Sequence, residues 1–360
     1  MRINFLDDSG RPKQFTRIAY GSDVAKTLEM KLINEIKTKC EIPTKKITIQ
    51  ELFNEYVEVK KYELRESSII RMKQAYVLYI LPTYKDYRID KLTVNDIQKW
   101  KISMEIRNLS LSTKKIAFTY FSTMINYAIK MGYLNDNPLS KVGSFKNILG
   151  IKPKIDFYTQ EEFNKFIISA KEIATEREKQ FNDVSEWNYY VFFNIAFYTG
   201  LRKGEIHALK WSDIDGSYLM VSRSISQRNL KNGDFEGVPK SNSSIRTLQM
   251  PLPLIEVLTK QKQRQQLLHN FDDDFRICGS IRDNTLRIRK SVYSSKARIK
   301  NIRTHDFRHS HATILANNNI NIQEVARRLG HARIELTWNT YCHLYPKEEE
   351  KAIAVFNSFN

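Results

Sequence analysis

One stretch without periodicity divides this sequence into two regions of unlike pattern. Residues 143–157, GSFKNILGIKPKIDF, combine glycine, proline and lysine and follow neither a helical nor a strand spacing. Apolar residues recur at helical spacing before it, whereas helical and strand patterns are mixed after it. A chain of 360 residues is also too long for one typical hydrophobic core. We therefore interpret the stretch as an interdomain linker and expect three domains, at residues 1–45, 46–150 and 151–360.

The middle region, residues 46–150, has a helical pattern throughout. Its first helix opens on Thr48 and Glu51, which have the spacing of a capping box. Apolar residues then recur on one face of that helix: Leu52, Phe53, Tyr56 and Val57. Three further helices are expected near 67–80, 93–106 and 112–131, and Gly132 and Pro138 end the last of them. The pattern predicts a helical domain.

The first 45 residues predict a small α+β unit. Two apolar stretches, Ile3–Leu6 and Phe15–Tyr20, flank the turn sequence DDSGRPKQ. An amphipathic helix is expected next, because Val24, Leu28, Leu32 and Ile36 recur at four-residue spacing. A few strands and one helix bury little surface, so the unit is an appendage with its own role or needs a partner.

The region after the linker predicts a mixed α+β domain. Thr159 and Glu162 form another capping box, and strand-like alternation is confined to residues 218–250, where Asn232 and Gly233 signal a hairpin turn. The tail 346–360 begins charged and ends apolar. It is expected to dock on its own catalytic domain or on a neighbouring protomer, and we predict the neighbouring protomer. The predicted fold is multidomain and mainly α, with α+β units at both ends and a three-stranded β-sheet in the last.

An excess of positive charge indicates a polyanionic partner. Lys and Arg number 58 against 40 Asp and Glu, a formal net charge of +18, which suits nucleic acid or an acidic membrane surface. The apolar runs fall short of the roughly 18–20 residues that cross a bilayer, no signal-peptide core is found, and three scattered cysteines suit a reducing cytoplasm. Singly, most basic residues are solvated surface; together, those of residues 46–150 predict a DNA-binding face, formed by Lys60, Lys61, Arg65, Arg71, Lys73, Lys114 and Lys115.

Four stretches place polar residues within otherwise apolar patterns. They are AFYTGLRKGEIHAL, GVPKSNSSIRT, RTHDFRHSHATIL and LGHARIELTWNTYCHLY. Taken singly, each has an ordinary interpretation: Arg202 and Glu205 as a surface ion pair, Lys240 as a turn lysine, His331 as a core histidine. The histidines of the third stretch could suggest a metal site, but the sequence offers no HExxH motif, neighbouring cysteine or third carboxylate. We predict no metal.

The combination of these residue types suits phosphoryl transfer. A phosphodiester under attack gathers negative charge on its non-bridging oxygens, which two guanidinium groups can neutralise with paired hydrogen bonds. An imidazole can hold or move a proton near neutral pH, and a lysine can protonate the departing 5′-oxygen. A phenol is a suitable nucleophile because its phosphodiester retains the energy of the broken bond. Such a reaction requires no cofactor and no ATP.

In their order and spacing, the stretches TGLRKGEI, PKSNSSIRT, THDFRHSHAT and LGHARIELTWNTYCH resemble the signature stretches of tyrosine recombinases. More narrowly, they resemble integrases of temperate phages and integrative elements related to lambda integrase. The stretches span residues 199–343; upstream, residues 46–150 are similar to the family's SAM-like core-binding domain and residues 1–45 to its arm-binding domain. The resemblance implies a site-specific DNA recombinase that integrates or excises a mobile element through a 3′-phosphotyrosine intermediate.

The resemblance also implies a role for each matched residue. Arg202 and Arg308 would clamp the scissile phosphate, with Glu205 supporting them, and Lys240 would be the general acid for the 5′-oxygen. His305 would assist proton transfer from the tyrosine. The remaining matches are His331, which would hydrogen-bond a non-bridging oxygen, the nucleophile Tyr341, and the supporting residues His309, Thr337 and His343.

The choice between two tyrosines can be argued from spacing. Tyr341 lies ten residues after His331, the separation in the family motif. Tyr345 is followed directly by Pro346, which disfavours a helical conformation at Tyr345. We predict that Tyr341 is the nucleophile, and that Tyr345 and Trp338 pack the helix that carries it.

The implied partners are double-stranded DNA attachment sites, a homotetramer on synapsed DNA, an excisionase and a DNA-bending protein, in the cytoplasm and nucleoid of a bacterial host. Three alternatives remain: a chromosome-dimer resolvase with the same chemistry, a catalytically silent DNA-binding regulator, and a metal-dependent nuclease. The basic N-terminal segment favours an integrase over a resolvase, and the complete residue set favours an enzyme over a regulator.

Overall fold

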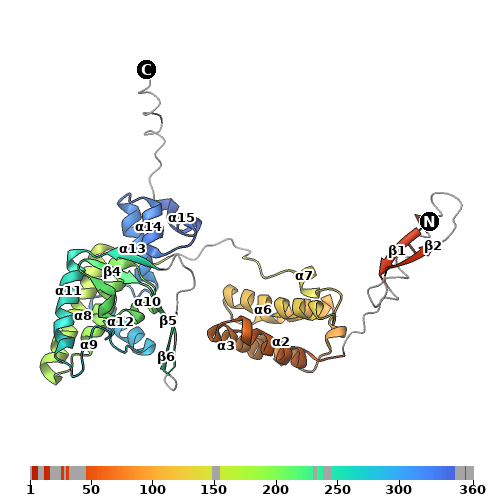
Figure 1. Ribbon diagram of the computed structural model, residues 1–360, viewed down its shortest axis with the longest axis horizontal. Helices are drawn as coiled ribbons and strands as arrows, with labels where there is room; N and C mark the ends of the chain where they lie inside the picture. Colours follow the sequence, from red (N-terminus) through yellow and green to blue (C-terminus); the bar gives the residue numbers. More distant parts are fainter. Residues whose placement is uncertain are drawn as a thin grey trace. The chain divides into compact units, whose positions relative to one another are not determined.

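The computed structural model describes residues 2–6, 12–16, 26–27, 30–31, 46–147, 155–229, 233–237, 245–344 and 353. The chain divides into two compact units, Met1–Ile151 and Lys152–Asn360 (Figure 1). This division falls inside the stretch interpreted as a linker, and the finer division into three domains remains a prediction.

The N-terminal strands form a hairpin. Strand β1 (Arg2–Leu6) pairs antiparallel with β2 (Pro12–Thr16), so two strands flank the predicted turn sequence, although β2 begins before Phe15. Residues 17–20 of the predicted second strand lie outside the described residues. Of the helix predicted over 24–36, four residues are described, and all four are helical: Lys26, Thr27, Met30 and Lys31.

Residues 46–147 form a helical bundle, as the sequence predicts. Its helices are α2 (Ile49–Glu63), α3 (Glu66–Ala75), a π-helical segment (Tyr76–Ile80), α4 (Leu81–Tyr84), α5 (Val94–Ile106), α6 (Leu111–Lys130) and α7 (Pro138–Val142). The capping box at the start of α2 is present, since Thr48 Oγ1 accepts a hydrogen bond from the Glu51 N–H and the Glu51 carboxylate accepts one from the Thr48 N–H. Aromatic side chains fill the core, with the rings of Trp100 and Phe121 5.4 Å apart.

Helix α7 was not predicted, because Pro138 was interpreted as the end of the preceding helix. The structure shows Pro138 in the first turn of a new helix, with the Asn137 side chain as its N-cap. A proline at the first helical position loses no hydrogen bond, since that N–H has no partner within the helix.

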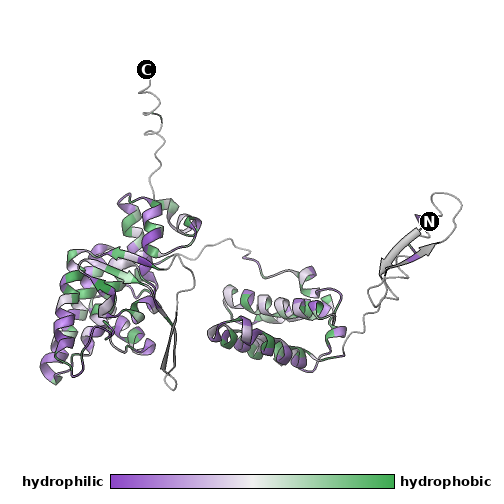
Figure 2. Cartoon of the chain, viewed as in Figure 1, coloured by the Kyte–Doolittle hydropathy of each residue, from purple (hydrophilic) through white to green (hydrophobic). Residues whose placement is uncertain are grey.

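Among the residues that the structure describes, the second unit is built from eight helices, one of which is buried at the centre. They are α8 (Gln160–Phe181), α9 (Glu186–Thr199), α10 (Lys203–Ala208), α11 (Leu252–Gln266), α12 (Asp283–Lys296), α13 (Asp306–Asn317), α14 (Ile322–Leu329) and α15 (Ile334–Tyr341). Helix α9 is apolar on nearly every side and lies in the core, where the Phe197 ring stacks on Phe163 of α8. Figure 2 shows hydrophobic and hydrophilic residues side by side on other helices, as in amphipathic helices.

The described residues of this unit also form two small antiparallel sheets. The three-stranded sheet has the order β3 (Ile214–Asp215), β4 (Tyr218–Val221), β7 (Arg246–Gln249). Strands β5 (Ser224–Asn229) and β6 (Gly233–Gly237) form a separate hairpin beside α10. The predicted three-stranded sheet and the hairpin signalled at Gly233 are confirmed. Strand β3 was missed because two residues are too few to show an alternating pattern.

Within the described residues, no helix combines the length and the apolar character that a membrane crossing needs.

Candidate active site

The junction of α9 and α10 supplies the first part of the site. Gly200 adopts a left-handed conformation, with φ of 66°, and ends α9. Arg202 then begins α10, where its backbone N–H and its Nη1 donate to the Glu205 carboxylate at 3.0 and 2.9 Å. Glu205 is only 2% exposed. The predicted alternative of an ordinary surface ion pair is therefore wrong, because the carboxylate is buried.

A second arginine completes this network. Arg246, on strand β7, donates from Nη2 to Glu205 Oε2 at 3.0 Å and from Nε to the Arg328 carbonyl at 2.8 Å. Burial alone would raise the pKa of Glu205, but the charges of Arg246 and Arg202 hold it below its ordinary value. Glu205 is thus ionised at neutral pH and joins α10 to the sheet.

The sequence interpretation missed Arg246. Its signal was the strand alternation in SIRTLQ, which places position 246 on the same buried face as Leu248. An arginine on the buried face of a strand needs a buried carboxylate, and Glu205 meets that need.

Helix α13 places the next guanidinium group within the same site. Arg308 is 4% exposed, and its Nη1 donates to the Gly200 carbonyl at 2.8 Å. Its Nη2 is buried and has no hydrogen-bond partner among the described residues. Burial and the charge of Arg202 lower the pKa of Arg308 to about 9, so the side chain is still cationic at neutral pH. An unsatisfied buried donor costs about 1–3 kcal/mol, more for a charged group, and indicates a site for an anion.

His331 lies in the loop that follows α14. Gly330, with φ of 65°, ends α14, and its carbonyl accepts a hydrogen bond from Arg202 Nη2 at 3.2 Å. His331 Nδ1 lies 2.7 Å from the Thr337 hydroxyl. Burial and the charge of Arg308 lower the pKa of His331 to about 4, so the ring is neutral. If the Thr337 hydroxyl donates to Nδ1, the ring proton lies on Nε2, where it can donate to an anion.

Tyr341 ends α15 and is 3% exposed, packed against Ala312, Val325 and Leu329. Its hydroxyl lies 2.5 Å from His309 Nδ1. Burial raises the pKa of the Tyr341 phenol, so the side chain is protonated. Helices α13, α14 and α15 lie together at one end of the unit (Figure 1).

The prediction that Trp338 packs its helix is wrong. Trp338 is 51% exposed, whereas Thr337 and Tyr341, four residues apart, form the buried face of α15. Around the helix, position 338 is rotated about 100° from Thr337 and about 60° from Tyr341. Tyr345 lies outside the described residues.

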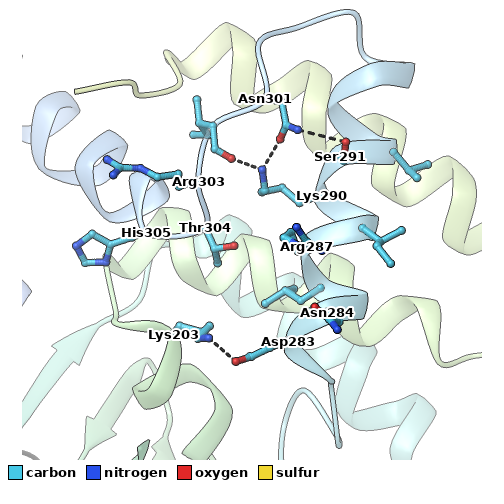
Figure 3. Close-up of a pocket in the computed structure, with 14 residues that line it drawn as sticks. Lys203, Asp283, Asn284, Arg287, Lys290, Ser291, Asn301, Arg303, Thr304 and His305 are labelled. Carbon is cyan, nitrogen blue, oxygen red and sulfur yellow. Dashed lines mark hydrogen bonds and ion pairs between the residues drawn. The ribbon is translucent and has the colours of Figure 1, made fainter. Parts of the chain in front are cut away.

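His305 lines a cavity of about 910 Å³ between α12 and the segment that leads into α13 (Figure 3). Lys203 and Asp283 meet in an ion pair at one end of it, and Lys290 donates to Asn301 and to the Ile302 carbonyl at the other. Burial and nearby cationic groups lower the pKa of His305. Among the described residues, no group of three or more His, Cys, Asp or Glu side chains could hold a metal ion.

Two predicted site residues are not placed by the structure. Lys240 lies between β6 and β7, outside the described residues, and the same holds for the side chain of His343. The structure thus brings together Arg202, Glu205, Arg308, His331, Thr337, His309 and Tyr341, with His305 at the wall of the adjoining cavity.

The predicted DNA-binding residues differ in exposure. Arg65, Arg71, Lys73 and Lys115 are exposed, and Lys60 and Lys61 form ion pairs with Glu63 and Glu58 on α2. Lys114 is different, because it is 9% exposed and donates to Glu105 at 2.5 Å. Its predicted position on the solvent face of its helix is wrong: α6 places it beside Ala117 and Phe118, on the buried side.

A buried cluster of arginines and a tyrosine, on a mixed α+β domain preceded by a helical bundle, defines the class of tyrosine recombinases. The chain belongs to the phage integrase family, which matches residues 159–348, just over half of the sequence. Residues 48–104 match the phage integrase N-terminal SAM-like domain. The predicted resemblance and the predicted fold class are therefore confirmed.

Relatives of this family cover nearly the whole chain. A tyrosine recombinase XerC-like protein of Caldanaerobacter subterraneus is 26% identical, over 90% of this chain and 86% of the relative. The ICEBs1 integrase of Bacillus subtilis is also 26% identical, with the same coverage of both chains. Family membership makes this chain a site-specific recombinase of the integrase type.

Solved structures of integrases have the same fold. The Tn1549 transposon integrase, in complex with a circular intermediate DNA, matches with a TM-score of 0.68 and 18% identity, over 87% of this chain and 100% of that chain. The lambda integrase tetramer bound to a Holliday junction matches with a TM-score of 0.58 and 15% identity, over 92% and 95%.

Proposed function

We propose that this recombinase cuts and rejoins DNA strands through a 3′-phosphotyrosine intermediate at Tyr341, and so integrates and excises a phage or mobile element. The observation that carries the proposal is Nη2 of Arg308, a buried cationic donor that has no hydrogen-bond partner among the described residues and whose charge acts on the buried Tyr341 phenol. A scissile phosphate supplies the missing anion. Arg202 and His331, held around Gly330, supply further donors to the same phosphate.

The cleavage step follows from these positions. The Tyr341 oxygen attacks phosphorus and loses its proton to a base, while the bond from phosphorus to the 5′-oxygen breaks and that oxygen takes a proton from Lys240. The guanidinium groups of Arg202 and Arg308 neutralise the charge on the non-bridging oxygens. Because one phosphodiester replaces another, a 5′-hydroxyl from a second strand can reverse the step. We propose that the route is topoisomerase-like and requires neither metal nor ATP.

We further propose that the chain acts as a homotetramer on synapsed attachment sites, in the cytoplasm and nucleoid of a bacterial host. The solved neighbours support this assembly, since they are an integrase with circular intermediate DNA and an integrase tetramer on a Holliday junction. An excisionase and a DNA-bending protein would control direction and bring distant sites together. The basic side chains of α2 and α3 would hold the phosphate backbone.

A nicked suicide substrate carrying the attachment site tests the proposal. Cleavage close to the nick releases a short fragment that carries the 5′-hydroxyl and diffuses away, so the enzyme stays attached to the 3′-phosphate of the remaining DNA. Wild type is expected to give an adduct stable to denaturant. Tyr341→Phe is expected to give none, while the matched control Tyr345→Phe forms the adduct. An adduct from Tyr341→Phe would contradict the assignment of the nucleophile.

A chromosome-dimer resolvase would use the same chemical steps as an integrase. The XerC-like name of one relative supports this second candidate function. Deletion of residues 1–45 separates the two. If the protein is an integrase that binds arm-type sites through residues 1–45, the deletion variant loses integration but still cleaves a core site. If it is a resolvase, the deletion variant recombines its site at the wild-type level. Any covalent adduct excludes a silent regulator, and cleavage that persists in EDTA excludes the metal-dependent nuclease.

A further inference from the structure

The third polar stretch carries three histidines, and the structure separates the first two of them. His305 lines the cavity beside α12. His309, one turn later on α13, faces α15, where its Nδ1 lies 2.5 Å from the Tyr341 hydroxyl. We propose that His309 is a catalytic residue that accepts the phenolic proton of Tyr341, a role that the sequence resemblance assigns to His305. This inference rests on the function proposed above.

Helix geometry explains why His309 reaches the nucleophile. Consecutive residues on an α-helix point about 100° apart, so His309 is turned away from the direction in which its neighbour Arg308 points. Arg308 faces the Gly200 carbonyl, and His309 faces the end of α15. One step along α13 therefore separates the group that holds the phosphate from the group that contacts the attacking oxygen.

His305 is less well placed for the same task. Its ring is perpendicular to that of His309, with centroids 5.2 Å apart, and the His309 and Tyr341 centroids are 5.9 Å apart. Among the described residues, no hydrogen bond joins His305 to Tyr341. A base must be within hydrogen-bond reach of the proton that it takes, and His309 meets this condition.

The charges around His309 suit a proton acceptor. Burial lowers its pKa, as do Arg303 and Arg308, while Asp306 raises it, and the His305 ring is its neighbour on α13. The imidazole is therefore neutral at pH 7, and Nδ1 can accept the phenol hydrogen bond in the tautomer with the proton on Nε2. A phosphate that pairs with Arg308 offsets one of the charges that weaken this base. Binding of DNA thus makes His309 a better proton acceptor.

The proton and the electron pairs balance in this scheme. The phenolic proton passes to His309 Nδ1 as the tyrosine oxygen bonds to phosphorus. The bond to the 5′-oxygen breaks, and that oxygen takes a proton from Lys240. On rejoining, an attacking 5′-hydroxyl returns its proton to Lys240, and His309 returns its proton to the departing phenolate. The enzyme is restored at the end.

The test compares two suicide substrates, one normal and one with sulfur in place of the bridging 5′-oxygen at the cut. A thiolate departs without a proton, so the sulfur substrate compensates for a lost general acid and leaves the need for a base unchanged. The key variant is His309→Asn, whose amide oxygen can hold the phenol but cannot take its proton. His305→Gln is the matched control on the same helix.

We expect His309→Asn to form the adduct about 10²–10⁴-fold more slowly on both substrates, with DNA binding unchanged and with a rate that rises with pH. Lys240→Ala should be slow on the normal substrate and restored on the sulfur substrate. His305→Gln should lose less activity than His309→Asn.

Adduct formation by His309→Asn at the wild-type rate would overturn the inference, as would restoration of its activity by sulfur. His309→Gln replaces this variant if the asparagine form does not bind DNA. These outcomes differ from failure of the proposed function, in which wild type itself forms no adduct on either substrate.

Discussion

The helical bundle and the active site differ in where their charged side chains lie, mostly exposed to solvent in the bundle and buried in the active site. On α2, Lys61 pairs with Glu58 in solvent, where their side chains are 45% and 67% exposed. In the active site, Glu205 and Arg246 pair with side chains 3% and 4% exposed, and Nη2 of buried Arg308 has no hydrogen-bond partner in the described part of the chain. Surface pairs add little to stability, whereas buried charges are costly. Folding does not require these charges to be buried. We therefore infer that the buried cluster has been selected to bind a ligand.

The largest effect that this comparison predicts is on catalysis. Arg308→Met should lower the rate of adduct formation by about 10²–10³-fold or more, because it removes donors to the phosphate. The same change should not lower the melting temperature, since it removes a buried charge that is only partly satisfied. Suicide-substrate rates and thermal unfolding check both points. Severe unfolding of this variant would mean that Arg308 stabilises the fold, and would contradict the view that its buried charge serves a ligand.

The next effect is on stability. Glu205→Gln leaves Arg246 buried without its charged partner and should destabilise the catalytic unit by about 3–5 kcal/mol. The double variant Glu205→Gln/Arg246→Met should recover part of that loss, because both charges are gone. Denaturant unfolding of the three variants measures this coupling. Additive losses in the double variant would show that the two residues do not act as a pair.

A third effect concerns pH. The seven histidines all follow residue 206, so the helical bundle has none. Burial lowers the pKa of His311 from 6.5 to about 3. Its folded form therefore binds fewer protons than its unfolded form, and stability is present above pH 6.5 and is lost as pH falls toward 3.

We expect the catalytic unit to lose on the order of 3–5 kcal/mol across that interval from His311 alone. The isolated bundle, residues 46–147, should change little between pH 6.5 and 5. Unfolding curves at several pH values measure the difference, and His311→Gln should flatten the curve of the catalytic unit. An equal slope in the two units would contradict this account.

The smallest effects belong to the bundle. Lys61→Ala should change the free energy of unfolding by less than about 1 kcal/mol. Lys73→Ala should reduce the salt dependence of DNA binding by about one phosphate contact, and Lys114→Ala should affect stability and leave that slope unchanged. Binding titrations at several salt concentrations separate these outcomes. A reduced slope for Lys114→Ala would show that this lysine reaches DNA.

Local pattern predicted the helices of the bundle and the order of the catalytic stretches, because spacing and capping are properties of neighbouring residues. It did not predict the pairing of Arg246 with Glu205, which joins a strand to a helix across 41 positions in sequence. Local pattern also did not show which face of a helix each residue occupies. The sequence analysis therefore predicts a buried Trp338 and an exposed Lys114, whereas Trp338 is exposed and Lys114 is buried. The contact of His309 with Tyr341 joins two helices, and no single stretch contains that information.

Mapping of the covalent link tests the central claim most directly. Wild-type enzyme is trapped on a suicide substrate and digested with protease, and the peptide that retains the nucleotide is sequenced by mass spectrometry. The buried cluster around Arg308 predicts one modified residue, Tyr341, linked to a 3′-phosphate. A nucleotide on Tyr345 or on another residue, or a 5′-phosphate link, would contradict the account.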